Sequence, residues 1–228
     1  MYICNLKARV LVTQSEENYL KNIYHLGKQG SISVNTNAIA EKINTKASSV
    51  TDMLKKLAEK ELVDYIKYQG VSLTNEGKII AANVIRKHRL WEVFLVEKLN
   101  FSWDEVHEVA EQLEHIKSQK LINEIDAFLG HPTHDPHGDP IPDKEGNLHK
   151  SQKIFLSQVN TSVVCSCVGV KDSSDNFLKY LDKNNIAIGT DIQIMNKESF
   201  DDSMKIKINN SELTISKEIA NNIYVKLN

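Results

Sequence analysis

Residues 36–62, TNAIAEKINTKASSVTDMLKKLAEKEL, decide the fold of the first part of the chain. Their apolar spacing predicts a short helix, a tight connection and a longer helix that begins at Ala47. Residues 63–77, VDYIKYQGVSLTNEG, then alternate around a central Gln-Gly pair, which is typical of a two-stranded hairpin. With a preceding helix over 16–27, this order of elements predicts a winged helix-turn-helix domain.

The longer of these helices carries the side chains that a recognition helix needs. Short polar groups near its N-terminus can reach base edges, and lysines can contact phosphates. A hairpin tip with a lysine and an aromatic ring suits a wing. The alternative is a winged helix that binds a protein partner through a solvated helix. We expect double-stranded DNA as the partner, contacted by Ser48, Ser49, Thr51 and Asp52 at the bases, by Lys46, Lys55 and Lys56 at the phosphates, and by Lys67, Tyr68 and Gln69 at the wing.

The charges of the chain are unevenly distributed. The net charge is −2 over 228 residues, but residues 41–89 carry ten Lys or Arg against six Asp or Glu. Residues 90–150 carry five against thirteen, and residues 151–228 carry nine of each. A basic segment beside an acidic, histidine-bearing one suggests an anion-binding module followed by a cation-binding module.

Residues 107–115, HEVAEQLEH, concentrate two histidines and three glutamates. On a helix that we expect to run to Leu129, the side chains of His107, Glu111, Glu114 and His115 fall within an arc of roughly 100°. Taken alone, such a pattern is more typical of a solvated helix face than of a metal site. Glutamates three positions apart nevertheless repel each other unless a cation lies between them.

Residues 86–95, RKHRLWEVFL, place His88 and Glu92 one helical turn apart. Such a pair more often stabilises a helix than binds a metal, but an antiparallel helix can bring His107 beside it. A zinc protease would need His-Glu-x-x-His, and that spacing is absent after His107. The loop over 130–147 holds further potential ligands between prolines, namely His131, His134, Asp135, His137 and Asp139. That loop could be a hydrolase metal site, a structural turn or a bridge that supplies ligands to the helices.

Several protein classes are disfavoured by composition. No apolar run approaches the length that spans a bilayer, and the first thirteen residues do not resemble a signal peptide. Three cysteines, Cys4, Cys165 and Cys167, form no disulfide framework, which predicts a reducing, cytoplasmic location. Cys165 and Cys167 share one face of a predicted strand and are expected in a core rather than at a metal.

From residue 151 on, short β-rich segments around one helix predict a small barrel.

Taken in order, these motifs resemble the diphtheria-toxin-repressor family of iron- and manganese-dependent repressors. The resemblance covers residues 15–228 and rests on SEENYLKNIYHL, the winged helix, IRKHRLWEVFL, VHEVAEQLEH and DPHGDPIP. It implies a homodimer that binds operator DNA when loaded with Fe(II) or Mn(II) and silences metal-uptake genes. It implies neither catalytic residues nor a small-molecule substrate.

The expected fold is mainly α with a small β part. It comprises an N-terminal extension (1–14), a winged helix-turn-helix DNA-binding domain (15–84), a helical metal-binding and dimerisation domain with its linker (85–150), and an SH3-like β-barrel of the FeoA type (151–228).

The resemblance also implies two metal sites in each subunit. The primary site maps to Asn18, Glu111, Glu114 and His115. The second site maps to His88, Glu92 and His107, joined by Asp135 and His137 from the linker and by Asp172 from the last domain. Iron-responsive relatives commonly have Met and Cys at the places of Asn18 and Glu111, and manganese-responsive relatives have Asp and Glu, so Asn18 departs from both patterns.

An oxygen-and-nitrogen donor set without a thiolate suits Mn(II), with Fe(II) as the alternative metal. We expect bound cations to neutralise the carboxylates and to tie the first helix to the middle domain, so that two recognition helices meet successive major grooves. Two other functions stay open. One is a metallo-hydrolase that uses the histidine-rich loop, and the other is a metal-independent winged-helix regulator whose acidic helices bind a protein.

Overall fold

The computed structural model describes residues 11–103, 105–148, 153–172 and 174–227. They fall into two compact units, of which the first comprises the chain up to Arg86 together with Pro142–Asn147, and the second comprises Lys87–Ile141 and Leu148–Asn228. Cys4 and most of the expected N-terminal extension (1–14) lie outside the described residues. Within the described ranges, no helix has the length and apolar character that crossing a bilayer requires.

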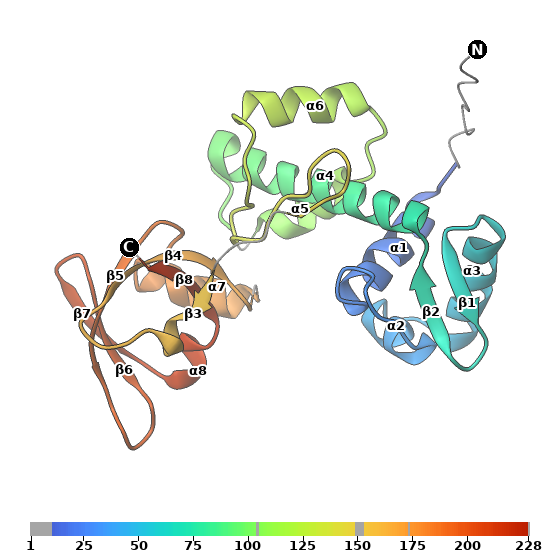
Figure 1. The fold of residues 1–228 in the computed structure, drawn as a ribbon. Coiled ribbons are helices and arrows are strands. Elements are labelled where there is room, and N and C mark those ends of the chain that lie inside the picture. The colour runs from blue at the N-terminus through green and yellow to red at the C-terminus, as the bar shows by residue number, and fades with distance from the viewer. Residues whose placement is uncertain (1–10, 104, 149–152, 173, 228) are drawn as a thin grey trace, which may run out of the picture. The chain divides into compact units, whose positions relative to one another are not determined.

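The first unit is a winged helix-turn-helix domain (Figure 1). Its elements are α1 (Gln14–Leu26), α2 (Thr36–Lys42), α3 (Ala47–Glu59), the hairpin strands β1 (Val63–Ile66) and β2 (Gly70–Leu73), and the beginning of α4 (Asn75–Leu99). The two strands pair antiparallel, with Val63 opposite Leu73. Gly70 has a φ of +111°, and a Cβ atom there would lie 2.7 Å from the carbonyl oxygen of Val34, so the wing requires a glycine. The predicted order of elements is confirmed.

Apolar faces of three helices form the core of this unit. Leu20 of α1, Ile39 of α2, and Leu54 and Leu57 of α3 have no exposed surface. Because these side chains recur at helical spacing, each helix buries one face and leaves the opposite face to solvent. The exposed face of α3 is therefore held outward by the packing of its other face.

The helical part of the second unit contains the end of α4 together with α5 (Val106–Leu113) and α6 (Gln119–Phe128), packed through residues such as Leu90, Ala110 and Ile122. The prediction of one helix from 107 to Leu129 is wrong. Ser118 is extended, and its side-chain oxygen accepts a hydrogen bond from the backbone N–H of Leu121 at 3.3 Å. A serine cap starts a new helix at this point, so Glu114 and His115 lie in the connection after α5.

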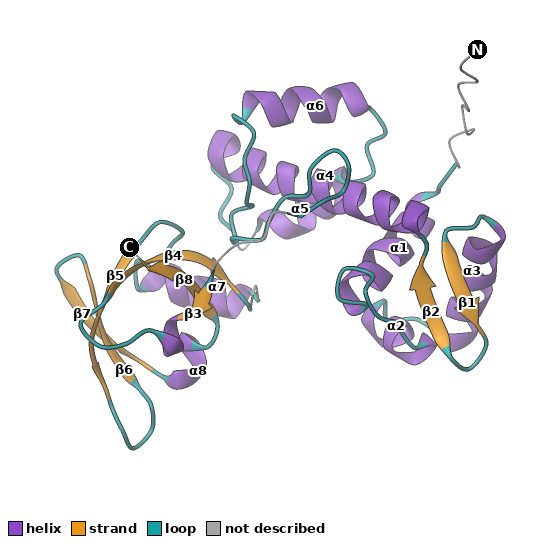
Figure 2. Ribbon diagram, in the orientation of Figure 1, coloured by secondary structure: helices purple, strands orange, loops and turns teal. Residues whose placement is uncertain are grey.

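The C-terminal part of the second unit is an antiparallel sheet with the strand order β3-β8-β4-β5-β6-β7 (Figure 2). Its elements are β3 (Ile154–Phe155), β4 (Val164–Val170), α7 (Asp175–Lys183), β5 (Asp191–Lys197), β6 (Met204–Ile208), β7 (Ser211–Ile215), α8 (Lys217–Ala220) and β8 (Ile223–Leu227). Cys165 and Cys167 are fully buried in its core beside Ile192 and Val225. The expected position of both thiols in a core is therefore confirmed.

Candidate metal centre and nucleic-acid interface

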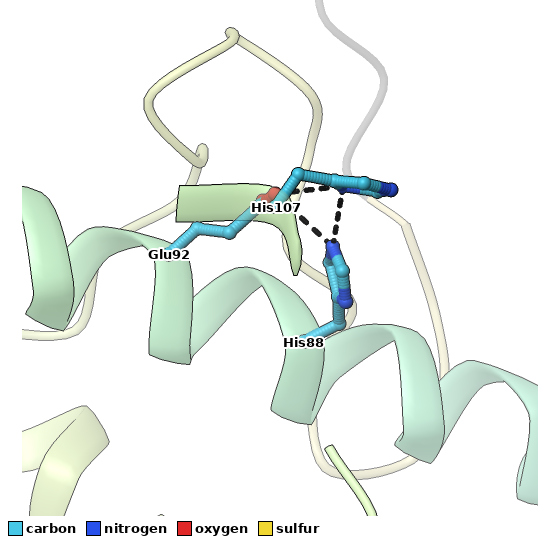
Figure 3. A group of neighbouring side chains, drawn as sticks. All are labelled: His88, Glu92 and His107. Carbon is cyan, nitrogen blue, oxygen red and sulfur yellow. Dashed lines mark hydrogen bonds and ion pairs between the residues drawn. The ribbon is translucent and has the colours of Figure 1, made fainter. Parts of the chain in front are cut away.

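His88, Glu92 and His107 bring three potential metal-binding atoms together in the second unit (Figure 3). His88 and Glu92 are one turn apart on α4, with Nε2 of His88 3.0 Å from Oε1 of Glu92. Nδ1 of His107, on α5, lies 3.1 Å from Nε2 of His88 and 3.3 Å from Oε1 of Glu92. The side chains of His88 and Glu92 are buried, whereas that of His107 is 63% exposed, so the group opens to solvent on the α5 side.

Residues from the proline-rich loop extend this group. Nδ1 of His137 lies 3.8 Å from Oε1 of Glu92, and Nε2 of His137 donates a hydrogen bond to the carbonyl oxygen of Trp103 at 2.9 Å. The indole ring of Trp103 is parallel to the imidazole of His137. A backbone acceptor on one ring nitrogen orients the other nitrogen toward Glu92, as is usual for metal-binding histidines.

Asp135 lies within 4.8 Å of potential ligand atoms of Glu92 and His137, but its carboxylate already has other partners. Oδ1 accepts hydrogen bonds from the backbone N–H groups of His137 at 2.8 Å and Asp139 at 2.9 Å. Oδ2 forms an ion pair with Nε of Arg89 at 3.3 Å. Asp135 thus fixes the turn that carries His137.

The same turn is fixed from two sides. Arg89 of α4 donates a hydrogen bond to the carbonyl oxygen of Pro140. On the other side, the carbonyl oxygen of His137 accepts the backbone N–H of Val170 at 2.8 Å. Gly138 has a φ of +82°, and a Cβ atom there would lie 2.0 Å from the carbonyl oxygen of Val168, so only glycine fits against β4.

Buried carboxylates and imidazoles shift one another's ionisation. Burial opposes the charged form of His88, but hydrogen bonds to Glu114 and Glu92 outweigh it and raise the pKa of His88 to about 9. Burial likewise opposes the charge on His137, and its contacts with Glu92 and Asp135 raise that pKa to about 9. Burial tends to raise the pKa of Glu92, but the three neighbouring histidines hold it well below its usual range. In Asp135, burial and the nearby Glu92 raise the pKa to about 7 despite Arg89.

This donor set fits a divalent transition metal. Imidazole nitrogens and carboxylate oxygens suit Mn(II), Fe(II) and Zn(II), and the group contains no thiolate. A metal requires deprotonated imidazoles, so a cation here would compete with the protons on His88 and His137. The residues present therefore match the chemistry of a metal that binds with release of protons.

Glu114 connects the predicted primary ligands to this group. Its Oε2 atom lies 2.7 Å from Nδ1 of His88, its Oε1 atom lies 3.7 Å from Nε2 of His115, and its side chain is fully buried. Glu111 is about half exposed, 3.9 Å from Nε2 of His107. Asn18 belongs to the first unit, where its backbone carbonyl oxygen accepts a hydrogen bond from Nδ2 of Asn22 at 2.8 Å. The assignment of these four residues to one site stays a prediction.

Asp172 belongs to neither group of potential ligand atoms found in the described residues. Its Oδ1 atom accepts the backbone N–H of Ser174 at 2.9 Å, just before α7. Two loop histidines are also outside these groups: His131 pairs with Asp126 at 3.0 Å, and Nδ1 of His134 lies 3.0 Å from the hydroxyl of Thr133. The role of Asp172 as a ligand likewise stays a prediction.

The predicted DNA-contacting residues lie on the exposed side of α3 and on the wing. Ser48, Ser49, Asp52 and Lys46 are exposed. Thr51 is half-buried, and its hydroxyl donates to the carbonyl oxygen of Ala47 at 2.9 Å. A pocket of about 390 Å³ lies between the start of α2, the start of α3 and the wing, and is lined by Asn35, Thr36, Asn37, Ala47, Thr51, Tyr65, Lys67, Tyr68 and Gly70. Its amide, hydroxyl and ammonium groups are of the kinds that contact phosphate oxygens.

The wing tip and the lysines of α3 differ in their environments. Tyr68 is 92% exposed, and the ammonium of Lys67 lies 4.8 Å from the centre of its ring, beside exposed Gln69. Lys55 makes an exposed ion pair with Asp52 at 3.2 Å. Lys56 instead points to buried Glu16 of α1, at 3.2 Å.

Sequence reasoning missed three residues that organise these sites: Glu16, Arg89 and Trp103. The spacing Thr13-x-x-Glu16 is a recognisable capping signal for the start of α1. No local signal identifies the partners of Arg89 or Trp103, because these contacts join segments more than thirty positions apart.

Comparisons with known proteins agree with this arrangement. Residues 11–71 match the family described as the iron dependent repressor, N-terminal DNA binding domain, and residues 74–143 match its metal binding and dimerisation domain. Residues 154–227 match the FeoA domain. The chain is similar to a solved manganese-dependent transcriptional repressor in complex with manganese, at 32% identity and a TM-score of 0.78, over 93% of this chain and 100% of that chain.

Two further relatives are similar over different lengths. The manganese regulator SloR matches at 33% identity and a TM-score of 0.68, over 95% of this chain and 100% of that chain. The iron-dependent repressor IdeR of Mycobacterium bovis is 31% identical over 131 residues, which cover 58% of this chain and 56% of that protein. The chain thus spans little more than half the length of this curated relative.

Proposed function

Since the chain belongs to the iron-dependent repressor family, we propose that it is a transcriptional regulator that binds double-stranded operator DNA as a homodimer when it is loaded with Mn(II). The observation that carries this proposal is the convergence of His88, Glu92 and His107 on one point near the surface. The exposed side chain of His107 gives a cation access from solvent, and the buried carboxylate of Glu92 supplies a negative charge that the cation can neutralise. We propose repression of metal-uptake genes as the outcome, in the cytoplasm.

The proposed ligands form two sets in each subunit. His88, Glu92, His107 and His137 make the second set, with Asp135 beside them and Asp172 as a further candidate. Asn18, Glu111, Glu114 and His115 make the primary set. The hydrogen bond between His88 and Glu114 joins the two sets, so the orientation of the His88 ring depends on a residue of the primary set. When bound, divalent cations supply the positive charge that offsets the carboxylates of both sets.

The choice of Mn(II) as the proposed metal is supported by the donor atoms of the chain. All proposed ligand atoms are oxygen or nitrogen, and the thiols of Cys165 and Cys167 are buried in the C-terminal sheet. Such a set favours Mn(II) over softer ions in geometry, while Fe(II) is the alternative because its ligand preferences overlap. Asn18 contributes a neutral oxygen where a carboxylate would add charge.

The proposed DNA contacts follow from exposure. Ser48, Ser49, Thr51 and Asp52 are offered to base edges, and Lys46 and Lys55 to phosphates, with Lys67, Tyr68 and Gln69 at the wing. Two α3 helices of a homodimer would contact major grooves roughly 34 Å apart. Asn18 lies on α1 of the same unit as α3, and a metal that fixes α1 thereby selects the arrangement that binds DNA.

The test is a metal titration of DNA binding. A duplex is first selected from a random-sequence pool on the purified, Mn(II)-loaded chain, and its affinity is then measured with Mn(II), with Fe(II) under anaerobic conditions, with Zn(II) and with chelator. We expect Mn(II) to raise the affinity at least tenfold over chelator, within the usual range of allosteric coupling of about 5- to 150-fold. Equal affinity in chelator would instead favour a metal-independent regulator.

A pair of histidine variants localises the effect. His107→Ala removes a proposed ligand and should reduce the response to Mn(II). His131→Ala is the control, because His131 is exposed, pairs with Asp126 and belongs to neither ligand group. Equal responses in both variants would exclude His107 from the site.

A further inference from the structure

Glu16 is a buried carboxylate at the start of α1. Its side chain has no exposed surface. Oε2 accepts the backbone N–H of Thr13 at 2.8 Å, and the hydroxyl of Thr13 accepts the backbone N–H of Glu16 at 3.3 Å. This reciprocal pair is a capping box, which a glutamine would complete equally well. The cap alone explains neither the burial of this side chain nor its charge.

Two lysines of the recognition helix balance that charge. Nζ of Lys60, the residue after the last turn of α3, lies 2.8 Å from Oε1 and 2.9 Å from Oε2 of Glu16. Nζ of Lys56, one turn earlier, lies 3.2 Å from Oε1. Lys60 also donates to the carbonyl oxygen of Leu11, just before α1, at 2.8 Å. The first turn of α1 is therefore joined to the last turn of α3 by ionic contacts as well as by apolar packing.

The contacts of Glu16 join α1, which carries a proposed metal ligand, to α3, which carries proposed DNA contacts. Asn18, the proposed ligand on α1, is two positions after Glu16. Five of the residues proposed to contact DNA, from Ser48 to Lys55, lie on α3, which carries Lys56 and ends next to Lys60. We infer that Glu16 is a positioning residue that holds α3 at a fixed orientation to α1, so that a constraint on α1 at Asn18 reaches the recognition helix. This inference rests on the proposed function, because it concerns how metal occupancy is transmitted to DNA.

A positioning role predicts that substitution of Glu16 changes how strongly Mn(II) raises the DNA affinity. It predicts no change in the affinity for Mn(II) or in the charge at the surface that contacts DNA. Glu16→Gln keeps the capping acceptor and loses the charge. Lys60→Met keeps the apolar stem and loses the ammonium. Lys60→Arg keeps a cation beside Glu16 and is the conservative variant. All three are made in the full chain, with Lys55→Met as the matched control on the same helix.

Three quantities are measured for each variant on the duplex selected with the wild-type chain. They are the ratio of DNA affinity in Mn(II) to that in chelator, the dependence of DNA affinity on salt, and the affinity for Mn(II) without DNA. We expect Glu16→Gln and Lys60→Met each to lower the affinity ratio at least fivefold, with the salt dependence and the Mn(II) affinity unchanged within a factor of about three. Lys60→Arg should keep most of the ratio.

The control should behave differently. Lys55→Met should lower the affinity in Mn(II) and in chelator alike, and should reduce the salt dependence, because it removes a phosphate contact. If Glu16→Gln unfolds the first unit, Lys60→Met and Lys60→Arg supply the same comparison at the other partner of the ion pair, and equal ratios in these two variants overturn the inference.

The outcomes separate this inference from the proposed function. A wild-type chain that responds to Mn(II), together with a Glu16→Gln variant that responds equally, overturns the inference alone. A wild-type chain whose DNA affinity ignores Mn(II) overturns the proposed function and this inference with it.

Discussion

Each unit of the molecule buries a carboxylate, but the two carboxylates are balanced by different cations. Glu16 in the first unit is paired with Lys56 and Lys60. Glu92 in the second unit is surrounded by the imidazoles of His88, His107 and His137. A lysine ammonium keeps its charge through the physiological pH range and has no lone pair to offer a metal. An imidazole can lose its proton and then coordinate a cation.

This difference distinguishes a structural ion pair from a proposed ligand site. The partners of Glu16 cannot be replaced by a metal without leaving ammonium groups beside it. The partners of Glu92 can exchange protons for a divalent cation and keep the group near neutrality. Glu16 and Glu92 are similarly buried, but only the partners of Glu92 can give way to a metal ion.

The largest effect is expected from Glu92→Gln. Gln has the same shape but no charge, and Glu92 is shared by both groups of potential ligand atoms. We expect the affinity for Mn(II), measured by isothermal titration, to fall by a factor on the order of 100 or more, above what loss of an outer contact costs. Glu16→Gln is the matched control and should retain Mn(II) affinity without DNA. Similar affinities in the two variants would remove the distinction drawn between these carboxylates.

The second largest effect is expected on the free energy of unfolding and its dependence on pH. Burial alone would raise the pKa of Glu16, but contacts with Lys60, Thr13 and Lys56 lower it to about 2. A carboxyl with a lowered folded-state pKa stabilises the fold above its unfolded value, near 4.5, and loses this contribution as the pH falls toward 2. Because both lysines are partly exposed, we expect Glu16→Gln to cost about 2 kcal/mol at pH 7.

The measurement is urea unfolding of wild type and Glu16→Gln in chelator between pH 7 and pH 2. The difference in unfolding free energy should shrink as the pH falls below about 5. A difference that is the same at pH 7 and pH 3 would mean that the charge of Glu16 does not stabilise the unit.

A smaller effect separates the two lysines of α3. Lys55→Ala should reduce the salt dependence of DNA binding by about one unit of slope, as for one lost phosphate contact. Lys56→Ala should reduce it by less than about half a unit, because Lys56 is engaged with Glu16. The slopes come from affinities at several salt concentrations. Equal slopes in the two variants would show that the ion pair leaves Lys56 available to DNA.

The smallest effect is expected for the chemical reactivity of the thiols in the C-terminal sheet. Burial and the neighbouring Cys167 raise the pKa of Cys165 to about 11, and burial raises the pKa of Cys167 to about 11. Thiols that stay protonated are poor nucleophiles, so both should resist Ellman's reagent at pH 8 in the folded chain and react in denaturant. The assay uses a Cys4→Ser background. Rapid labelling of the folded chain would place at least one thiol within reach of solvent and of metals.

Local patterns sufficed for much of the fold. Apolar spacing predicts α1 to α4 and the wing, since amphipathic helices and hairpins have short-range signals. Apolar spacing alone predicts a continuous helix through residues 114–118, but α5 ends at Leu113 and Ser118 caps the start of α6. A single capping serine is a weak signal in the sequence, and the continuing apolar spacing outweighs it when a helix is predicted from the pattern alone.

For the candidate site, His88 and Glu92 could be paired from the sequence because residues four apart on a helix lie on one face. Their meeting with His107 was an expectation about two antiparallel helices, and the described distances agree with it. The engagement of Asp135 with Arg89 and with two backbone amides could not be anticipated, because it depends on how the loop packs against α4.

Spacing and composition alone were enough to establish a winged helix, an acidic helical segment with candidate ligands and a β-rich end, because these properties depend on neighbours within a few turns of chain. Which charges are buried, and beside what, was settled only by packing. Glu16 meets Lys60 across 44 positions of sequence, and His137 reaches Glu92 only because β4 and Arg89 hold its turn. Burial removes water from a charge and makes its partner indispensable, and burial is a property of the folded chain that no short segment contains.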